Sequence, residues 1–229
     1  TMGGLDRDVF FYKFGLIPAE LARGADFTRL LVAPGQILDI ASPIPPWGTV
    51  FTSMFIHSGI VHFAGNMIFL WVFGDGVEDR IGHIKYLLFY SGAGIAAAWA
   101  QTAVGMDSQV PTIGASGAIA GILGAYFMLF PYSRVTTLVV FYFITTVRVP
   151  AVMLLGFWAF LQIFNGVGSL GPSQTGGVAY WAHLGGFTVG LLIIALYRLV
   201  RRETLWPQRR PQWPPISMED KWWTGPPQA

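Results

Sequence analysis

The chain has 229 residues, of which 53% are hydrophobic and 11% are charged. Soluble domains carry about 25% charged residues, so this composition excludes an ordinary soluble domain and favours a membrane protein. The absence of cysteine excludes disulfide bonds and thiolate metal sites, and a net charge of +2 without a basic patch gives nucleic-acid binding no support.

Residues 1–50 precede the first membrane-length apolar stretch. Their apolar runs are interrupted by Asp, Lys and Glu, so nothing in them resembles a signal peptide. We expect residues 1–50 to form an extracytoplasmic loop region, because of the distribution of Lys and Arg described below.

Five stretches are apolar and long enough, or nearly so, to cross a bilayer as helices, which takes about 20 residues. They are residues 51–73, 86–104, 113–130, 150–166 and 178–199. The run 135–147 is apolar but shorter, and it predicts an interfacial or re-entrant connection, with a sixth span as the alternative. The predicted fold class is all-α, a polytopic transmembrane helix bundle. Residues 201–229 end in a segment rich in Pro that lacks apolar periodicity, which predicts a disordered cytoplasmic tail.

Lys and Arg in short loops predict the orientation, because they accumulate on the cytoplasmic side. The loops after the first and third stretches and the chain after the fifth contain Arg80, Lys85, Arg134, Arg148, Arg198, Arg201, Arg202, Arg209 and Arg210. The two other loops, GMDSQVPT and GVGSLGPSQTGG, contain neither residue. The first, third and fifth spans are therefore expected to enter from outside. Residues 1–50 then lie outside as well, which predicts either a preceding transmembrane helix, which we favour, or export without one.

Polar side chains recur near the outer ends of these three spans. Ser116 lies about three residues, roughly 5 Å, into the third span, and His183 about five residues, roughly 8 Å, into the fifth. His62 and Asn66 are four residues apart and share a helix face, whereas His57 is expected to point about 140° away from them. Polar groups within a span are costly unless they are paired or functional, so the pattern predicts one shared site.

Small residues favour close contact between the third and fifth spans. Gly117 and Gly121 form one GxxxG pattern, and Gly186 and Gly190 form another. This spacing allows transmembrane helices to approach closely. The serine and the histidine on these helices are therefore expected to reach hydrogen-bond distance.

Three motifs, HSGIVHFAGN, GASG and AHLGG, follow one another on the three spans. Together they resemble the rhomboid family of intramembrane serine proteases over about residues 43–200, and VEDRIG is also similar to the family pattern. The structural positions of these motifs are Gly114, Gly117, Gly186, Glu78 and Gly82. The resemblance implies a six-helix core whose first helix would precede residue 1, with a protease domain over 51–200 after the loop region.

The resemblance also implies the chemistry. Ser116 would be the nucleophile and His183 the general base. His62 and Asn66 would supply side-chain donors to the oxyanion, together with the backbone N–H of Ser116. No Asp or Glu lies between Asp107 and Glu203, so a Ser-His dyad without a carboxylate, cofactor or metal is expected. The substrates would be transmembrane segments of other proteins, cut near their outer ends in a bacterial inner membrane.

Several residues leave alternatives open. Position 120 is Ala where some family members have an aromatic residue stacked on the catalytic histidine, so the sequence leaves open what orients His183. Gln101 and Gln162 are interpreted as hydrogen-bond partners between helices. Trp158 and Phe157 fit a lateral gate and bilayer-facing packing about equally well. The alternative function is a catalytically silent rhomboid-like protein that binds transmembrane segments; a transporter or channel is a more distant one, because no repeated half is seen.

Overall fold

The computed structural model describes residues 4–33, 36–140, 142, 144–170 and 177–207. The predicted disordered tail lies, from residue 208 onward, outside the described residues. Within these described ranges, four helices are long and apolar enough to cross a membrane. They are α4 (Ile60–Ile81), α5 (His83–Val104), α7 (Ala151–Gly168) and α8 (Tyr180–Val200).

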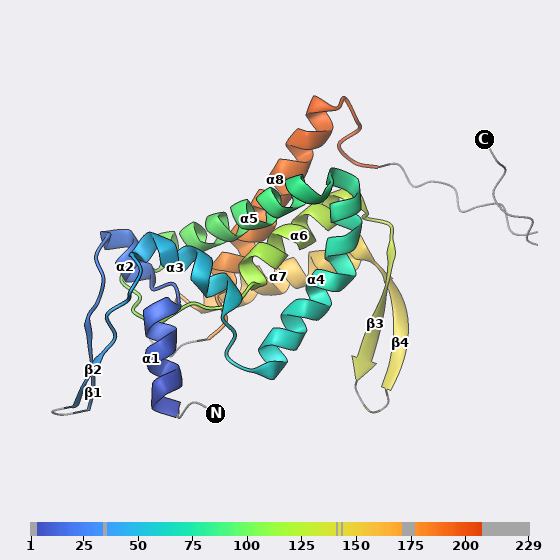
Figure 1. Cartoon of the computed structure of the whole chain (residues 1–229). Coiled ribbons are helices and arrows are strands. Elements are labelled where there is room, and N and C mark those ends of the chain that lie inside the picture. The colour runs from blue at the N-terminus through green and yellow to red at the C-terminus, as the bar shows by residue number, and fades with distance from the viewer. Residues whose placement is uncertain (1–3, 34–35, 141, 143, 171–176, 208–229) are drawn as a thin grey trace, which may run out of the picture.

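A fifth apolar helix, α6 (Ser116–Leu129), forms the centre of the bundle (Figure 1). It packs against α4, α5, α7 and α8, and most of its side chains are buried. With 14 residues it is about 21 Å long, shorter than the hydrocarbon core of a bilayer. The third predicted span is therefore a short helix enclosed by longer ones.

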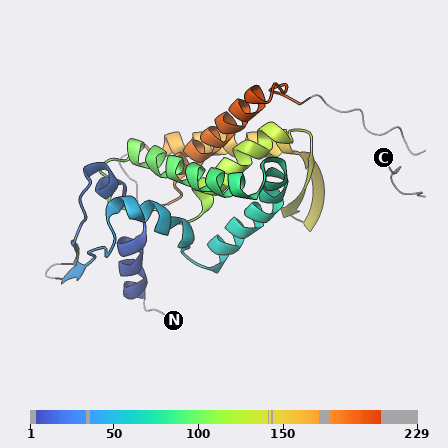
Figure 2. The ribbon, with the colours of Figure 1, turned by 45° about the horizontal axis from the view of Figure 1, so that its top comes forward.

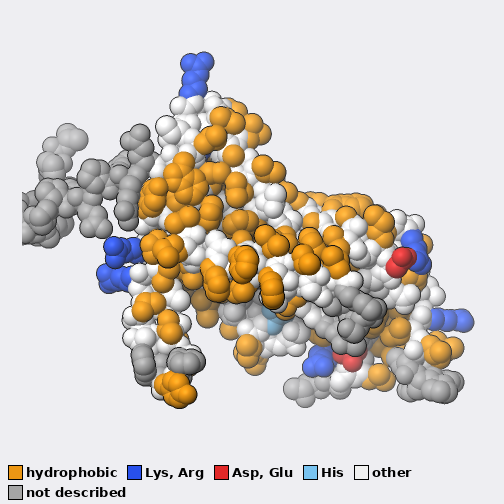
Figure 3. All heavy atoms as spheres, turned by 180° about the vertical axis from the view of Figure 1, so that it is seen from behind, with side chains coloured by type: hydrophobic (Ala, Val, Ile, Leu, Met, Phe, Trp, Pro, Cys, Tyr) orange, Lys and Arg blue, Asp and Glu red, His pale blue; other side chains and the backbone are white. Residues whose placement is uncertain are grey.

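The outer surface of the bundle is apolar, as expected for helices surrounded by lipid. Figure 3 shows one face, on which hydrophobic side chains gather in a broad band and charged side chains lie toward the margins. On α7 and α8 the exposed hydrophobic residues are Met153, Phe157, Phe160, Ile163, Phe164, Val167, Leu192, Ile193, Leu196, Leu199 and Val200.

The first predicted span is wrong in its boundaries. The chain from Pro46 forms a short helix, α3 (Pro46–Thr52), and a single 3₁₀ turn, η1 (Ser53–Phe55), before α4 begins at Ile60. Gly59 before α4 is fully extended, which separates the two helical segments. At its other end α4 continues through the charged VEDRI segment to Gly82, whose φ of 86° suits glycine.

The predicted connection at 135–147 is a β-hairpin beside the bundle, and the alternative of a sixth helical span is wrong. Strands β3 (Arg134–Val140) and β4 (Ile144–Pro150) pair antiparallel, with Arg134 opposite Pro150. Both strands are rich in Val, Ile and Thr, whose branched side chains suit a pleated strand better than a helix. The all-α expectation holds for the bundle, and this hairpin is an addition to it.

The amino-terminal region contains α1 (Gly4–Phe14), α2 (Pro18–Arg23) and a second antiparallel hairpin, β1 (Arg29–Ala33) with β2 (Gln36–Asp39). Figures 1 and 2 place this region on the opposite side of the bundle from β3 and β4. Leu16 joins it to the core through a two-way backbone pairing with Thr112, with N···O distances of 3.0 and 2.7 Å. Thr112 lies four residues before Ser116, so the amino-terminal region stabilises the segment that leads into α6.

Glu20 in α2 is a buried carboxyl group with an exposed fraction of 1%. Its Oε1 accepts a hydrogen bond from the Phe27 backbone N–H at 2.8 Å. Burial raises the pKa of Glu20 to about 7, with the Phe27 hydrogen bond acting against this rise and the neighbouring Asp26 carboxyl adding to it. A carboxyl group whose pKa is higher in the folded than in the unfolded state binds its proton more tightly when folded. Its contribution to stability is therefore complete below about pH 4.5 and is lost as the pH rises through about 7.

We expect the free energy of unfolding to fall by up to about 3 kcal/mol between pH 5 and pH 8 because of Glu20. Glu20→Gln keeps the shape and removes the titration, so this fall should disappear in the variant. Thermal unfolding in detergent micelles across this pH range measures the effect. Parallel pH dependences in the wild type and the variant would contradict the assignment to Glu20.

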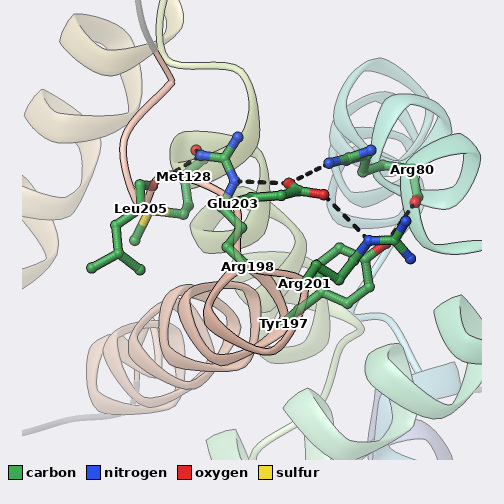
Figure 4. Close-up of polar contacts among 7 residues, drawn as sticks. All are labelled: Arg80, Met128, Tyr197, Arg198, Arg201, Glu203 and Leu205. Carbon is green, nitrogen blue, oxygen red and sulfur yellow. Dashed lines mark hydrogen bonds and ion pairs between the residues drawn. The ribbon is translucent and has the colours of Figure 1, made fainter.

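A polar cluster joins the C-terminal ends of α4, α6 and α8 (Figure 4). Ser116 lies at the other end of α6. Arg198 of α8 is buried, and its Nη1 donates to the carbonyl oxygens of Met128 at 3.2 Å and Leu205 at 2.9 Å. Glu203 accepts a hydrogen bond from Arg80 at the end of α4 and lies 3.7 Å from the Nε of Arg198. Since Met128 belongs to α6, this cluster ties together the helices that carry the candidate site residues.

Candidate active site

Ser116 is the first residue of α6, rather than lying three residues inside a span. The preceding segment enters as non-helical chain, and Gly114 has a φ of 119°, which L side chains rarely adopt. The N–H of Gly114 donates to the Ser53 carbonyl at 2.8 Å. The GASG motif therefore forms a glycine-dependent turn that places the serine at the N-terminus of the buried helix α6.

His183 lies in the first turn of α8, which starts at Tyr180. Its Nε2 is 2.8 Å from the Oγ of Ser116. The structure thus brings together the serine and the histidine that are 67 residues apart in the chain. This is the arrangement of a nucleophile beside a base.

Glycines on both helices make this contact sterically feasible. A Cβ built on Gly186 would overlap the carbonyl oxygen of Gly117, and one on Gly190 would overlap the carbonyl oxygen of Gly121. The backbones of α6 and α8 are therefore in direct contact. On its other side Gly117 faces α5, where a Cβ would lie 2.7 Å from that of Ala97.

His62 on α4 borders the same turn. A Cβ built on Gly114 would lie 2.9 Å from the Nε2 of His62 and 3.8 Å from the Oγ of Ser116, so only glycine leaves room here. The backbone N–H of Ser58 donates to the Nδ1 of His62 at 3.3 Å. Because Nδ1 is the acceptor in this bond, the neutral ring carries its proton on Nε2 and presents a donor toward the site.

Asn66 lies one turn further along α4 and is buried, with an exposed fraction of 7%. Its Nδ2 donates to the carbonyl oxygen of His62 at 2.8 Å, and its Oδ1 is buried without a partner. An amide nitrogen carries two hydrogens, so one donor is used within α4 and the other is available. The expectation that His62 and Asn66 share a face of the helix is met.

The expectation that His57 points away from His62 is wrong. His57 precedes α4, and its ring lies edge-on to that of His62 with 5.1 Å between ring centroids. Helical geometry does not apply to a residue outside the helix, which explains the error. Burial lowers the pKa of His57, and its Nε2 is buried without a partner. Its ring packs edge-on against both His62 and Phe63.

Two residues of α7 contact His183, and sequence reasoning identified neither contact. The Oε1 of Gln162 lies 2.8 Å from the Nδ1 of His183, and the ring of Trp158 lies 6.0 Å from the imidazole at an interplanar angle of 36°. The expectation that Gln162 is a hydrogen-bond partner between helices is met, but the sequence did not identify His183 as that partner. Phe157, in contrast, is 62% exposed on the surface of the bundle.

The remaining motif positions lie at the far end of α4. Glu78 accepts a hydrogen bond from the Nδ1 of His83 at 2.6 Å, and the N–H of Gly82 donates to the Glu78 carbonyl at 2.7 Å. These residues shape the turn between α4 and α5. In the part of the chain that the structure describes, no three His, Asp or Glu side chains gather as metal ligands would.

A small cavity of about 30 Å³ lies beside the serine. Ser116, Thr112 and Gly114 contribute to its wall, together with small side chains of α5, α6 and α8. A cavity of this volume has room for a single water molecule.

Comparisons with known proteins agree with this geometry. A family model described as the rhomboid domain matches residues 46–200, about two thirds of the chain. The chain is 38% identical over 106 residues to rhomboid protease GluP of Bacillus subtilis (strain 168), an alignment covering 46% of the chain and 20% of that protein. It is 30% identical over 151 residues to the mitochondrial rhomboid protein 1 of Saccharomyces cerevisiae, covering 63% of the chain and 40% of that protein.

The third relative is the mitochondrial presenilin-associated rhomboid-like protein of Bos taurus, 27% identical over 170 residues, with 69% of the chain and 39% of that protein covered. The chain thus spans between a fifth and two fifths of the length of these three relatives. The family match takes in α4 to α8, and with them the helices that carry Ser116, His183, His62 and Asn66. The chain is a multi-pass membrane protein and belongs to the rhomboid family.

Proposed function

We propose that the protein is an intramembrane serine endopeptidase that uses Ser116 and His183. The observation that carries this proposal is the 2.8 Å contact between the Oγ of Ser116 and the Nε2 of His183. It joins two helices whose backbones touch, so the pair is held before any substrate binds. Membership of a family with relatives named as proteases supports it.

In the proposed reaction the Oγ of Ser116 attacks the scissile carbonyl carbon while its proton passes to the Nε2 of His183. The tetrahedral intermediate collapses by expelling the amine, which takes that proton. A water molecule, deprotonated by His183, then hydrolyses the acyl-enzyme and regenerates the serine. The cavity beside Ser116 supports a water position near the bond that must be hydrolysed.

We assign the oxyanion to the side of Ser116 that faces α4. His62 would donate from Nε2, Asn66 from its second amide hydrogen, and Ser116 from its backbone N–H at the start of α6. The orientation of His62 by Ser58 and the absence of a side chain at Gly114 both support this assignment. A donor of this kind typically lowers the barrier by about 3 to 4 kcal/mol.

The proposed substrates are transmembrane segments of other proteins, because the site lies at the ends of α6 and α8 within a lipid-facing bundle. The distribution of Lys and Arg supports an orientation with the site toward the extracytoplasmic side and the end of α8 in the cytoplasm. We place the protein in a bacterial cell membrane, where the bilayer and its protein substrates would be its partners.

A fluorophosphonate probe, which reacts with activated serines, tests the proposal on the purified chain in detergent. We expect labelling of the wild type and of Ser169→Ala, whose serine only caps α7, and loss of labelling in His183→Ala. Equal labelling of wild type and His183→Ala would show that His183 is not the general base. A folded wild type that binds transmembrane peptides without being labelled would favour the catalytically silent alternative.

A further inference from the structure

Gln162 occupies the position beside His183 where soluble serine hydrolases place a carboxylate. Its side-chain amide is buried in α7, with an exposed fraction of 8%. The two nitrogens of the imidazole have separate partners, since Nε2 contacts the Ser116 hydroxyl and Nδ1 contacts Gln162, each at 2.8 Å. The ring is thus held between α6 and α7.

Trp158 gives the same ring a second contact from α7. It precedes Gln162 by four residues, so both side chains project from one face of the helix. Its ring is tilted by 36° to the imidazole with 6.0 Å between the ring centroids, and it also packs on Phe187, one turn after His183 on α8. The contact of Gln162 with Nδ1 and the neighbouring Trp158 ring together restrict the movement of the imidazole.

The tautomer of His183 follows from these contacts. To accept the proton of Ser116, Nε2 must be unprotonated, and the neutral ring then carries its hydrogen on Nδ1. That hydrogen needs an acceptor, because a buried donor without a partner is unfavourable. The Oε1 of Gln162 is placed to accept it. Without this acceptor the other tautomer, which cannot act as the base, becomes competitive.

We propose that Gln162 is a positioning residue that orients His183 and selects its Nδ1-protonated form, so that the site works as a Ser-His-Gln relay without a carboxylate. The inference rests on the proposed protease function and adds a residue to it. During the reaction Nδ1–H remains bonded to the Gln162 oxygen while Nε2 gains and returns the serine proton. The amide takes no proton at any step and therefore acts through His183.

The replacement Gln162→Leu removes the acceptor at similar volume. We expect it to slow the rate of fluorophosphonate labelling at pH 7.5 by roughly 10- to 100-fold, the loss that follows from one unpaired buried hydrogen-bond group. In cleavage of a transmembrane substrate, the loss should fall on kcat with KM nearly unchanged, because Gln162 touches His183 rather than substrate.

The replacement Gln162→Glu separates a positioning role from a purely structural one, because a purely structural role would leave the pH dependence of the labelling rate unchanged. A carboxylate at this position stabilises protonated His183, so the rise of the labelling rate with pH should move to higher pH. Among the described residues, His62 is the other titratable group that acts on His183, and it is unchanged in this variant. Labelling at alkaline pH should be retained in Gln162→Glu, which shows that the fold survives.

Asn165→Leu is the matched control, since Asn165 is exposed on the same helix and its side-chain Nδ2 donates to the Leu161 carbonyl rather than to His183. It should leave the rate and the pH profile unchanged. Wild-type rates and profiles in both Gln162 variants would overturn the positioning role while leaving the protease function standing. Should Gln162→Leu fail to fold, the profile of Gln162→Glu decides alone. Absence of labelling at Ser116 in the folded wild type would contradict the proposed protease function, and the role of Gln162 would then be contradicted as well.

Discussion

Ser116→Ala is expected to abolish cleavage of a model transmembrane substrate, with a loss of at least about a thousandfold in kcat. The reason is that the alanine has no oxygen to form the acyl-enzyme, and no other hydroxyl is hydrogen-bonded to His183 in the described residues. The measurement is cleavage of a labelled substrate reconstituted with the enzyme in proteoliposomes, followed over time against the wild type.

The double variant Ser116→Ala/His183→Ala tests whether the two residues act as one catalytic unit. Residues that act as one unit are strongly non-additive, so the double variant should be no slower than the single ones. Thermal unfolding of Ser116→Ala should remain close to that of the wild type, because the change removes one partly exposed hydroxyl group. Cleavage that persists in a folded Ser116→Ala protein would show that another group is the nucleophile.

Gly190→Ala is expected to have the largest effect on stability. The added Cβ overlaps the carbonyl oxygen of Gly121, and a backbone atom cannot move aside as a flexible side chain can. Helices α6 and α8 must then separate, at a cost of about 3 kcal/mol or more, which exceeds the gain of about 1 kcal/mol from the better helix former. Separation also moves His183 away from Ser116, and a shift of about 1 Å can lower the rate about 100-fold.

Gly92→Ala on α5 is the control for this prediction, because nothing lies within 4 Å of a Cβ built there. It should leave stability unchanged or raise it slightly. Thermal unfolding and probe labelling of the two variants, compared in one detergent, provide the measurement. Equal melting temperatures for Gly190→Ala and Gly92→Ala would show that α6 and α8 are not in backbone contact.

The spacing of polar and small residues was sufficient to predict much of the site. Ser116 and His183 were placed at similar depth from helix rise and loop charge, and the structure brings them into contact. Helical periodicity correctly placed His62 and Asn66 on one face, because both lie within α4. The same rule failed for His57, since the helix begins only after Gly59.

The hairpin at 134–150 and the start of α4 show a second limit of sequence reasoning. Both segments are apolar, and apolarity alone does not distinguish a strand or a short re-entering helix from a span. Their ends depend on pairing between β3 and β4 and on the contacts of η1 with α6, which involve distant parts of the chain.

The sequence by itself determined the membrane character, the bundle of apolar helices and the residues of the proposed dyad, because hydrophobic length and residue spacing are local properties. Only the tertiary structure decided what orients His183. Gln162 and Trp158 lie more than twenty residues away on another helix, and their effect depends on how α7 is rotated against α8. That rotation arises from the packing of the whole bundle, which no single segment encodes.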